Sequence, residues 1–211
     1  MITIQRFVFN DFQTNTYVLH DETNECVVID PACQNEHEWT KIREYISNNH
    51  LKIADVVLTH CHTDHLLGCY LFTDTYGIGY RIHPKGKIFL GFANEFATAY
   101  NINLGKIYEP SGYFEEGDFI KFGNSKLEVR YTPGHADGSV CFSCPEQDFV
   151  ISGDVLFHES IGRTDLPTGN YNVLKENIES KLFTMPDETI VYPGHGPSTT
   201  IGHEKINNPF L

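Results

Sequence analysis

The segment Thr59-His60-Cys61-His62-Thr63-Asp64-His65 places three imidazole rings and one carboxylate within seven residues. It follows residues 53–58, a short apolar run rich in β-branched side chains, which is typical of a buried strand. Residues 66–72, directly after it, suit the beginning of a helix. The sequence therefore predicts that four potential metal ligands lie on one turn between a strand and a helix.

The spacing of these four side chains predicts two neighbouring metal ions. His60 and His62 stand two residues apart in an extended turn, so their rings can face one ion. Asp64 and His65 fall in the first turn of the predicted helix, which rotates them toward a second ion. The alternative is a turn that is rich in histidine by chance. Four potential ligands in six positions argue strongly against that alternative.

The composition is that of an ordinary folded protein. Of the 211 residues, 40% are hydrophobic and 20% are charged, and we expect them to form one domain over residues 1–211. A net charge of −13, from 15 basic and 28 acidic residues, argues against a nucleic-acid partner. No signal peptide is evident, and no run approaches the roughly 18 apolar residues of a membrane span. We therefore expect a cytoplasmic protein without a membrane partner.

The six cysteines are expected to be free, buried thiols. Only Cys141 and Cys144 have a recognisable spacing, and a zinc ribbon would need a second such pair. Cys61 lies between two predicted ligands. In an extended turn its side chain points opposite to theirs, so we do not expect it to bind metal.

The hydrophobic pattern predicts two similar halves. In the first half, residues 2–30 alternate as three antiparallel strands with a turn at 21–24, helices cover 36–47 and 64–74, and a strand covers 77–82. In the second half the predicted elements are strands near 119–121, 127–131, 139–143, 148–151 and 189–192, and a helix over 173–183. This order predicts two mixed β-sheets packed face to face with helices outside, a four-layer αβ/βα sandwich.

An aromatic stripe is expected on a helix between residues 85 and 110. Phe92, Phe96 and Tyr100 recur every four residues, with Phe89 and Ala93 beside them. Packing against the sheet is the interpretation that this pattern favours. A flap over the active site and a dimer contact are the alternatives, so both a monomer and a homodimer stay open.

Three more potential ligands follow strands in the second half. His135, Asp154 and His195 each come after a predicted strand and directly after a glycine. A glycine lets the backbone turn tightly and approach a site closely. A single histidine at a strand end is usually an ordinary surface or core residue. Here four strand ends each carry a potential metal ligand, and together they predict one common site.

The histidine-rich turn, followed in order by His135, Asp154 and His195, resembles the metallo-β-lactamase superfamily over essentially the whole chain. The resemblance implies two metal sites joined by a bridge: His60, His62 and His135 on one metal, Asp64, His65 and His195 on the other, and Asp154 between them. An aspartate at 154 is similar to that of the thioester and phosphoester hydrolases, whereas true β-lactamases usually lack it. Residues 162–165 and 199–211 narrow the resemblance to single-domain hydrolases like glyoxalase II.

This resemblance implies a metal-dependent hydrolase of small thioesters such as S-lactoylglutathione. Two divalent cations, zinc or else iron or manganese, lower the pKa of a shared water and polarise the substrate carbonyl. A thiolate leaves without a strong general acid, so a thioester suits such a site. Asp64 is the residue best placed to orient the nucleophile, and we expect it to be catalytic.

Two departures from glyoxalase II bear on the substrate. The last ligand stands in Gly194-His195-Gly196-Pro197, where that family has Gly-His-Glu-Tyr, and its C-terminal helical domain has no counterpart before Leu211. Half of the usual glutathione site is therefore missing. Arg163 matches a basic residue that contacts glutathione in that family. It is the expected anchor for a substrate carboxylate, with bracing of its loop through Asp165 as the alternative.

The persulfide dioxygenases are the competing interpretation. They share this fold, the histidine-rich turn and a Gly-Arg-Thr-Asp loop like residues 162–165. They hold a single iron with two histidines and an aspartate, which resemble His60, His135 and Asp154. The sequence of residues 193–197 favours the hydrolase.

Overall fold

The computed structural model describes residues 1–211. The first half of the chain contains β1 (Thr3–Phe9), β2 (Thr14–His20), β3 (Glu25–Ile29), α1 (Glu36–Asn48), β4 (Lys52–Val57), α2 (Thr63–Leu66), α3 (Cys69–Tyr76), β5 (Arg81–Ile82), α4 (Lys87–Ala99) and β6 (Gly112–Tyr113). The second half contains β7 (Phe119–Phe122), β8 (Ser125–Tyr131), β9 (Val140–Cys144), β10 (Phe149–Gly153), β11 (Leu156–Phe157), β12 (Ser160–Ile161), α5 (Tyr171–Asn177), β13 (Ile190–Pro193), β14 (Thr199–Thr200) and α6 (Ile201–Asn207).

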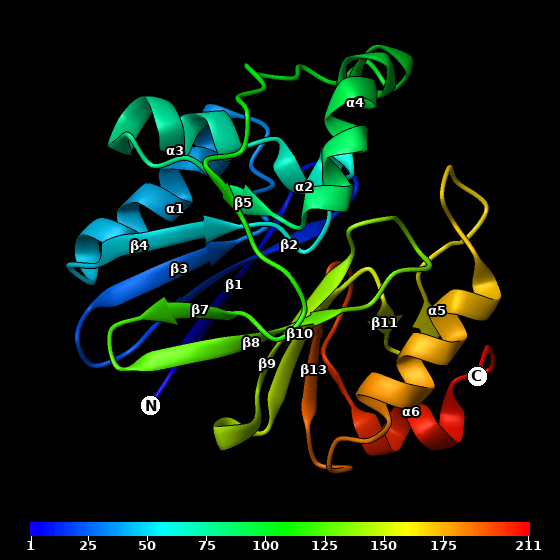
Figure 1. The fold of residues 1–211 in the computed structure, drawn as a ribbon. Helices are drawn as coiled ribbons and strands as arrows, with labels where there is room; N and C mark the ends of the chain where they lie inside the picture. Colours follow the sequence, from blue (N-terminus) through cyan, green and yellow to red (C-terminus); the bar gives the residue numbers. More distant parts are fainter.

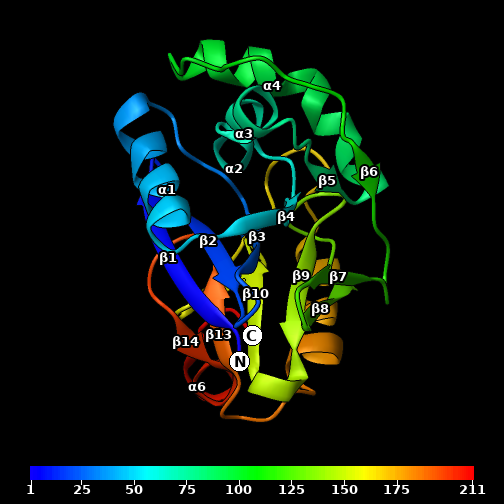
Figure 2. The same cartoon turned by 90° about the vertical axis from the view of Figure 1, so that its left-hand side faces the viewer.

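Most of the strands form two mixed sheets of six. The first has the order β1-β2-β3-β4-β5-β6 and the second the order β14-β13-β10-β9-β8-β7. Figure 1 shows the sheets one against the other, with α1 and α3 on the outer side of the first and α5 and α6 on the outer side of the second. The same layers are visible in the turned view of Figure 2. The predicted αβ/βα sandwich is confirmed.

Alternation along the strands explains the layers. In β2 and β3, Val18 and Val28 face a core shared with α1 and α3, while Leu19 and Val27 face the second sheet. A third core lies between the second sheet and the helices that follow it, where Leu174 of α5 packs among buried side chains of β9, β10 and β13. Each sheet is thus buried on both faces, as the continuous apolar runs of these strands require.

The strand directions bring the ends of the predicted ligand-bearing strands together. Strand β4 runs parallel to β3, and β13 runs parallel to β10. The two sheets are joined at this edge, because the N–H of Asn15 donates to the Gly194 carbonyl at 2.7 Å and the N–H of Val140 donates to the Thr59 carbonyl at 2.8 Å. Residues that follow four strands therefore converge on one edge of the sandwich.

Local departures from the predicted elements have identifiable causes. The helix expected over 64–74 is two helices, α2 and α3, because the N–H of Gly68 donates to the Pro31 carbonyl at 2.7 Å instead of continuing the first helix. A side chain at position 68 would also collide with Cys33. The strand expected over 77–82 shortens to β5, and the helix expected from 173 begins at Tyr171, where Asn170 caps it. Helix α6 was not predicted.

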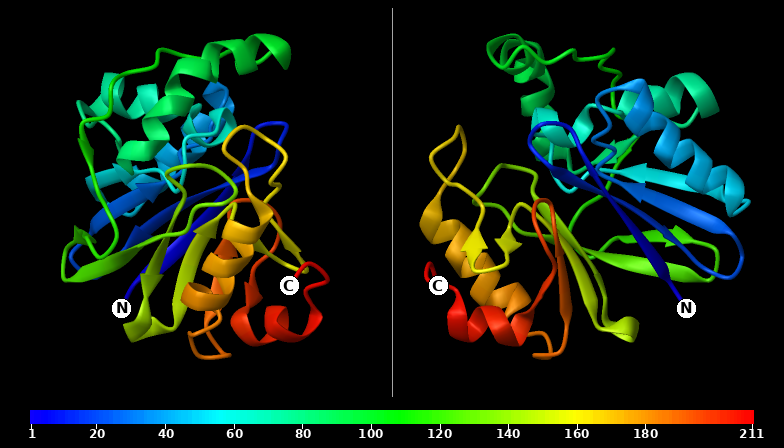
Figure 3. Two further views of the ribbon diagram at one scale, coloured as in Figure 1. Left: turned by 45° about the vertical axis from the view of Figure 1, so that its right-hand side comes forward. Right: turned by 180° about the vertical axis from the view of Figure 1, so that it is seen from behind.

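The aromatic stripe is real, but packing against the sheet is the wrong interpretation for most of it. Phe89 and Ala93 are buried, whereas Phe92 is 51% and Tyr100 57% exposed. Helix α4 packs beside α2, and Figure 3 shows it at the end of the molecule opposite to α5 and α6. The exposed part of the stripe faces the cavity described below.

All six cysteines are free and buried, as predicted. A side chain at Gly86 would collide with Sγ of Cys61, so this thiol points toward that loop, and burial raises its pKa. None of the helices has the length and the apolar character that crossing a membrane requires.

Candidate metal centre

Three ring nitrogens meet at the first cluster. Nε2 of His60 lies 3.1 Å from Nδ1 of His62, and Nε2 of His135 lies 2.9 Å from the same Nδ1. His60 and His62 follow β4, and His135 follows β8. Three imidazole nitrogens that point at one another can hold a divalent cation on three sides.

A second cluster lies beside the first. Nε2 of His65 is 3.3 Å from Nε2 of His195, and Oδ2 of Asp64 is 3.4 Å from the former nitrogen and 3.3 Å from the latter. Asp64 and His65 stand in α2, and His195 follows β13. This cluster offers two nitrogens and one carboxylate oxygen to a second cation.

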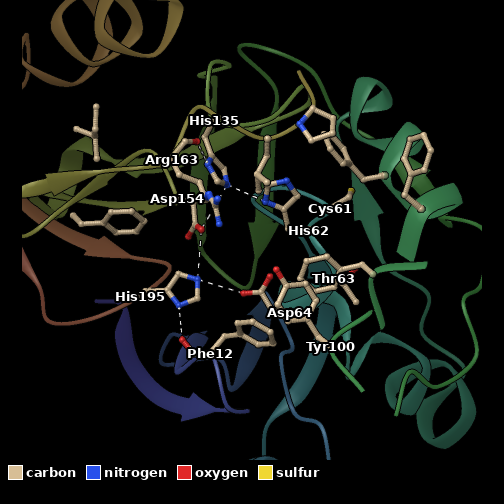
Figure 4. Close-up of a pocket in the computed structure, with 17 residues that line it drawn as sticks. Phe12, Cys61, His62, Thr63, Asp64, Tyr100, His135, Asp154, Arg163 and His195 are labelled. Atoms are coloured by element: carbon tan, nitrogen blue, oxygen red, sulfur yellow. Dashed lines mark hydrogen bonds and ion pairs between the residues drawn. The ribbon is translucent and has the colours of Figure 1, made fainter. Parts of the chain in front are cut away.

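Asp154 touches both clusters. Its Oδ2 lies 3.6 Å from Nε2 of His135, and its Oδ1 lies 3.4 Å from Nε2 of His65. Figure 4 shows its carboxylate between His135 and His195. Oδ1 is buried without a hydrogen-bond partner in the protein. An orphaned buried carboxylate oxygen is costly, so its position fits a cation that would complete it.

The far nitrogens of four histidine rings each have a partner. Nδ1 of His65 faces the Asp30 carboxylate at 3.0 Å and Nδ1 of His60 faces the Thr59 hydroxyl at 3.2 Å. The other two contacts are those of His135 with the Arg163 carbonyl at 2.8 Å and of His195 with the Phe12 carbonyl at 3.0 Å. Such partners fix the ring orientation and leave Nε2 free for a cation.

The charges of the metal-free clusters differ. Burial lowers the pKa of His62 to about 4 and that of His60 well below its usual range, so these rings are neutral. Burial would also lower the pKa of His195, but hydrogen bonds to Asp154 and Asp64 outweigh it and raise that pKa to about 9. Burial would raise the pKa of Asp64, yet the neighbouring His65 charge lowers it to about 2. In the second cluster, the protonated His195 ring is thus paired with the carboxylates of Asp64 and Asp154. A bound cation would replace that proton.

Gly194 makes the close packing of the centre possible. A Cβ at this position would overlap the Oδ1 atom of Asp154 and would lie 2.8 Å from the His65 ring. Only a glycine fits between β13 and these two side chains. This explains the glycine that precedes the last histidine of the sequence pattern.

The clusters open into a cavity of about 510 Å³. Of the seven predicted ligands, His62, Asp64, His135, Asp154 and His195 line it, while His60 and His65 lie almost fully buried behind them. The aromatic side chains Phe12, Phe89, Phe92, Phe96, Tyr100 and Phe157 line the rest together with Arg163 and a few aliphatic residues. The structure therefore brings together every predicted ligand and the predicted substrate anchor.

Arg163 makes two different contacts. Its guanidinium pairs with Asp165 through Nε–Oδ1 at 2.8 Å and Nη2–Oδ2 at 2.7 Å, and its backbone carbonyl faces His135. The side chain lines the cavity but is 58% exposed. The bracing contact considered from the sequence is present, and the side chain is also within reach of a ligand in the cavity.

Sequence analysis missed Asp30. This residue follows β3 directly, in Ile29-Asp30-Pro31, and is buried against His65 and Thr59. It adopts a left-handed backbone conformation with φ of 51°, which is uncommon for a residue other than glycine. The signal that could have found it is a carboxylate at a strand end, the same pattern that identified Asp154.

Comparison with known proteins identifies the family. The model of the metallo-β-lactamase superfamily matches residues 9–195. The chain belongs to this superfamily. Its relatives include the probable metallo-hydrolase YqgX of Bacillus subtilis, 36% identical over 98% of this chain and 96% of that protein, and the hydroxyacylglutathione hydrolase GloC of Haemophilus influenzae, 34% identical over 95% and 93%.

Solved members of the superfamily have the same fold. The BLEG-1 B3 metallo-β-lactamase superposes with a TM-score of 0.90 at 32% identity over 99% of both chains. TTHA1623 in a di-iron-bound form gives 0.87 at 33% identity over 98% of this chain and all of that chain, and ETHE1 from Myxococcus xanthus gives 0.79 at 27% over 98% and 83%. The family, the relatives and the histidine and aspartate clusters support a metal-binding hydrolase.

Proposed function

We propose that this protein is a binuclear metal-dependent hydrolase of thioesters, of the glyoxalase II type. The observation that carries the proposal is the position of Asp154, whose two carboxylate oxygens lie 3.6 Å and 3.4 Å from nitrogens of different clusters. A carboxylate placed in this way suits a bridge between two cations. The similarity to the hydroxyacylglutathione hydrolase GloC supports the thioester as substrate.

In this proposal His60, His62 and His135 would hold one cation, Asp64, His65 and His195 would hold the other, and Asp154 would serve both. Divalent zinc, iron or manganese ions would supply a water of lowered pKa and a Lewis acid for the carbonyl. The relative TTHA1623 has been solved with two irons. The identity of the two cations is therefore to be measured by elemental analysis.

Asp64 orients the attacking water. Its pKa of about 2 keeps the carboxylate ionised at neutral pH, and the Thr14 hydroxyl donates to its Oδ2 at 2.9 Å, which fixes its orientation. An ionised carboxylate at the cavity wall accepts a hydrogen bond from water and directs the lone pair of the oxygen toward the substrate.

No side chain of the cavity competes as the nucleophile. The cavity has no serine and no lysine, its one threonine, Thr63, is almost fully buried, and its single thiol, Cys61, is buried with a raised pKa. A thiolate of low basicity leaves without protonation. The side chains present are therefore sufficient for a thioester and less suited to an amide, whose leaving amine needs a proton.

Thiol release tests the proposal. Metal-loaded protein should release thiol from S-lactoylglutathione, and Asp154→Ala should not. A β-lactam in the same panel tests the activity of the BLEG-1 relative, and oxygen uptake with a glutathione persulfide tests the dioxygenase alternative. That alternative rests on His60, His135 and Asp154: Oδ2 of Asp154 lies 3.9 Å from Nε2 of His60 and 3.6 Å from Nε2 of His135. One bound iron with oxygen uptake and no thiol release would replace the hydrolase proposal.

A further inference from the structure

One wall of the cavity is aromatic. We define the aromatic wall as Phe12, Phe89, Phe92, Phe96 and Tyr100, all of which line the cavity. Phe96 and Tyr100 are stacked at 4.4 Å between ring centroids, and Phe12 contacts both, at 6.1 Å and 5.7 Å. The wall joins the loop after β1 to helix α4, so two distant segments of the chain supply it.

The aromatic wall reaches the candidate metal centre itself. The Phe89 ring lies edge-on to the His62 ring at 5.1 Å between centroids. Phe12 supplies the carbonyl that faces Nδ1 of His195. The aromatic wall therefore begins beside one histidine of each cluster. A substrate whose carbonyl group lies at the clusters would place one of its two arms against the aromatic wall.

Helix α4 exposes apolar surface that its own packing does not use. Phe89, Ala93 and Ala97 bury one face of the helix against the core, whereas Phe92 and Tyr100 are more than half exposed at the cavity. Large aromatic side chains that gather at the mouth of a cavity mark a surface that binds apolar groups. Removal of this surface from water is the favourable term that a ligand can gain here.

The charges of the cavity do not match a glutathione moiety. Glutathione carries two carboxylates and one ammonium group. Outside the candidate metal ligands, the one cationic side chain of the cavity is Arg163, and it is already paired with Asp165. The acidic residues Asp64 and Asp154 belong to the clusters. Charged groups placed against aromatic rings without partners would lose hydration.

We infer that the preferred substrates are thioesters with an apolar acyl group, alkanoyl or aromatic, that packs on the aromatic wall. Figure 4 shows Tyr100 and Phe12 near Asp64, and Arg163 near Asp154 and His135. This inference rests on the proposed thioesterase activity and names its substrate class.

A series of acyl thioesters of one neutral thiol, N-acetylcysteamine, tests the inference. With metal-loaded protein, kcat/KM should rise roughly fourfold for each methylene from acetyl through butanoyl to hexanoyl, because about 0.8 kcal/mol is gained per buried methylene. Hexanoyl-N-acetylcysteamine should exceed S-lactoylglutathione in kcat/KM. The double variant Phe92→Ser, Phe96→Ser should flatten this dependence on chain length.

The matched control is Ile88→Ser. Ile88 is on the same helix and is 52% exposed, like Phe92, but it does not line the cavity. It should keep the full dependence on chain length. Equal flattening in Ile88→Ser and in the double variant would assign the effect to the stability of α4 and overturn the inference.

A binding experiment separates this inference from the proposed function. Calorimetry with the non-hydrolysable thioethers S-methyl- and S-hexyl-N-acetylcysteamine should show tighter binding of the hexyl compound by at least about tenfold. Equal binding, or a flat rate series with thioesters that are hydrolysed, overturns the apolar substrate class and leaves the thioesterase intact. Tighter hexyl binding without hydrolysis of any thioester supports the apolar site and overturns the thioesterase proposal.

Discussion

Asp30 holds His65 in the orientation that the second cluster requires. The Asp30 carboxylate lies 3.0 Å from Nδ1 of His65 and accepts hydrogen bonds from the N–H and the hydroxyl of Thr59 at 2.7 Å and 2.6 Å. All three residues are almost fully buried. With Nδ1 engaged by a carboxylate, His65 is held with its Nε2 directed toward the cluster.

Asp30→Ala should therefore weaken binding of the second metal without removing a ligand. We expect a loss of about 10- to 100-fold in metal affinity, the usual cost of removing the partner of a ligating histidine. Competition of the protein with a chromophoric chelator measures this affinity. Asp30→Asn should recover part of the loss, because an amide oxygen can still accept from Nδ1.

Asp21→Ala is the matched control for Asp30→Ala. Asp21 is also buried and accepts hydrogen bonds from the N–H and hydroxyl of one threonine, Thr23, at 2.9 Å and 2.6 Å, but it lies in the turn between β2 and β3. It should lose about 1–3 kcal/mol of unfolding free energy and keep both metals. Equal loss of metal in the two variants would contradict the role of Asp30 as a positioning residue.

Metal stoichiometry is the second prediction. The two clusters and the shared Asp154 should bind close to two equivalents of zinc, iron or manganese, measured by elemental analysis after dialysis. Asp154→Ala should lose metal as well as thioesterase rate, because the variant removes the charge that both cations share. Two metals and normal turnover in Asp154→Ala would show that the bridging assignment is wrong.

A third group of potential ligands requires a control in that experiment. His158, Glu159 and His203 lie on the surface, with Nε2 of His203 at 3.0 Å from Oε1 of Glu159. Such an exposed group can take up cations when metal is in excess. His203→Asn should remove this uptake and leave the two equivalents of metal at the candidate centre unchanged. The metal stoichiometry is therefore measured in both the wild type and His203→Asn.

The third prediction tests the close packing at Gly194. Gly194→Ala should displace Asp154 or His65, because the added methyl group would overlap the first and crowd the second. Loss of metal and of activity is the expected result. Gly91→Ala is the control, since an added methyl there meets nothing within 4 Å in the exposed middle of α4. It should stabilise the fold by up to about 1 kcal/mol. Full metal content in Gly194→Ala would contradict this explanation of the glycine.

The seven candidate ligands could be found from the sequence because each stands directly after a strand or in the first helical turn that follows one. That relationship is local, and parallel neighbours such as β10 and β13 bring the strand ends to one edge. Asp30 has the same position after β3. It is not identified from the sequence, because the pattern of residues 2–30 indicates only antiparallel strands.

Other features depend on contacts between distant residues. The periodicity of α4 reveals two apolar faces, but only the fold determines that Ala93 is buried and that Phe92 faces the cavity. The break between α2 and α3 depends on the Pro31 carbonyl, which is far from Gly68 in sequence. Helix α6 places only Ile201 in a hydrophobic core, so its sequence carries little helical periodicity.

The fourth prediction concerns acid stability and Asp21. Burial would raise the pKa of Asp21, but hydrogen bonds from Thr23, Ser125 and the backbone of Asn124 outweigh it and lower the pKa from 3.8 to about 2. A depressed pKa stabilises the fold above the unfolded value of 3.8, and this contribution is lost as the pH falls through about 2.

Urea unfolding of metal-free wild type and Asp21→Asn measures this contribution. The difference in unfolding free energy between the two proteins should be constant above about pH 5 and should shrink as the pH falls from about 4 to 2. A difference that grows in this interval would show that the carboxylate is destabilised in the fold, against the contacts seen at Asp21.

The last prediction uses the competition between Asp165 and a substrate carboxylate for Arg163. With S-lactoylglutathione, Arg163→Ala should chiefly raise KM, by about tenfold, because an exposed carboxylate contact is made equally in the ground and transition states. The metals should stay bound, because the contact of His135 is with the Arg163 backbone carbonyl. Asp165→Asn should lower KM instead, because it frees the guanidinium from its present partner. If Arg163 only braced the loop, both substitutions would break the same brace and change the kinetics in the same direction. A collapse of kcat with unchanged KM in Arg163→Ala would place this residue at the chemistry or in the fold.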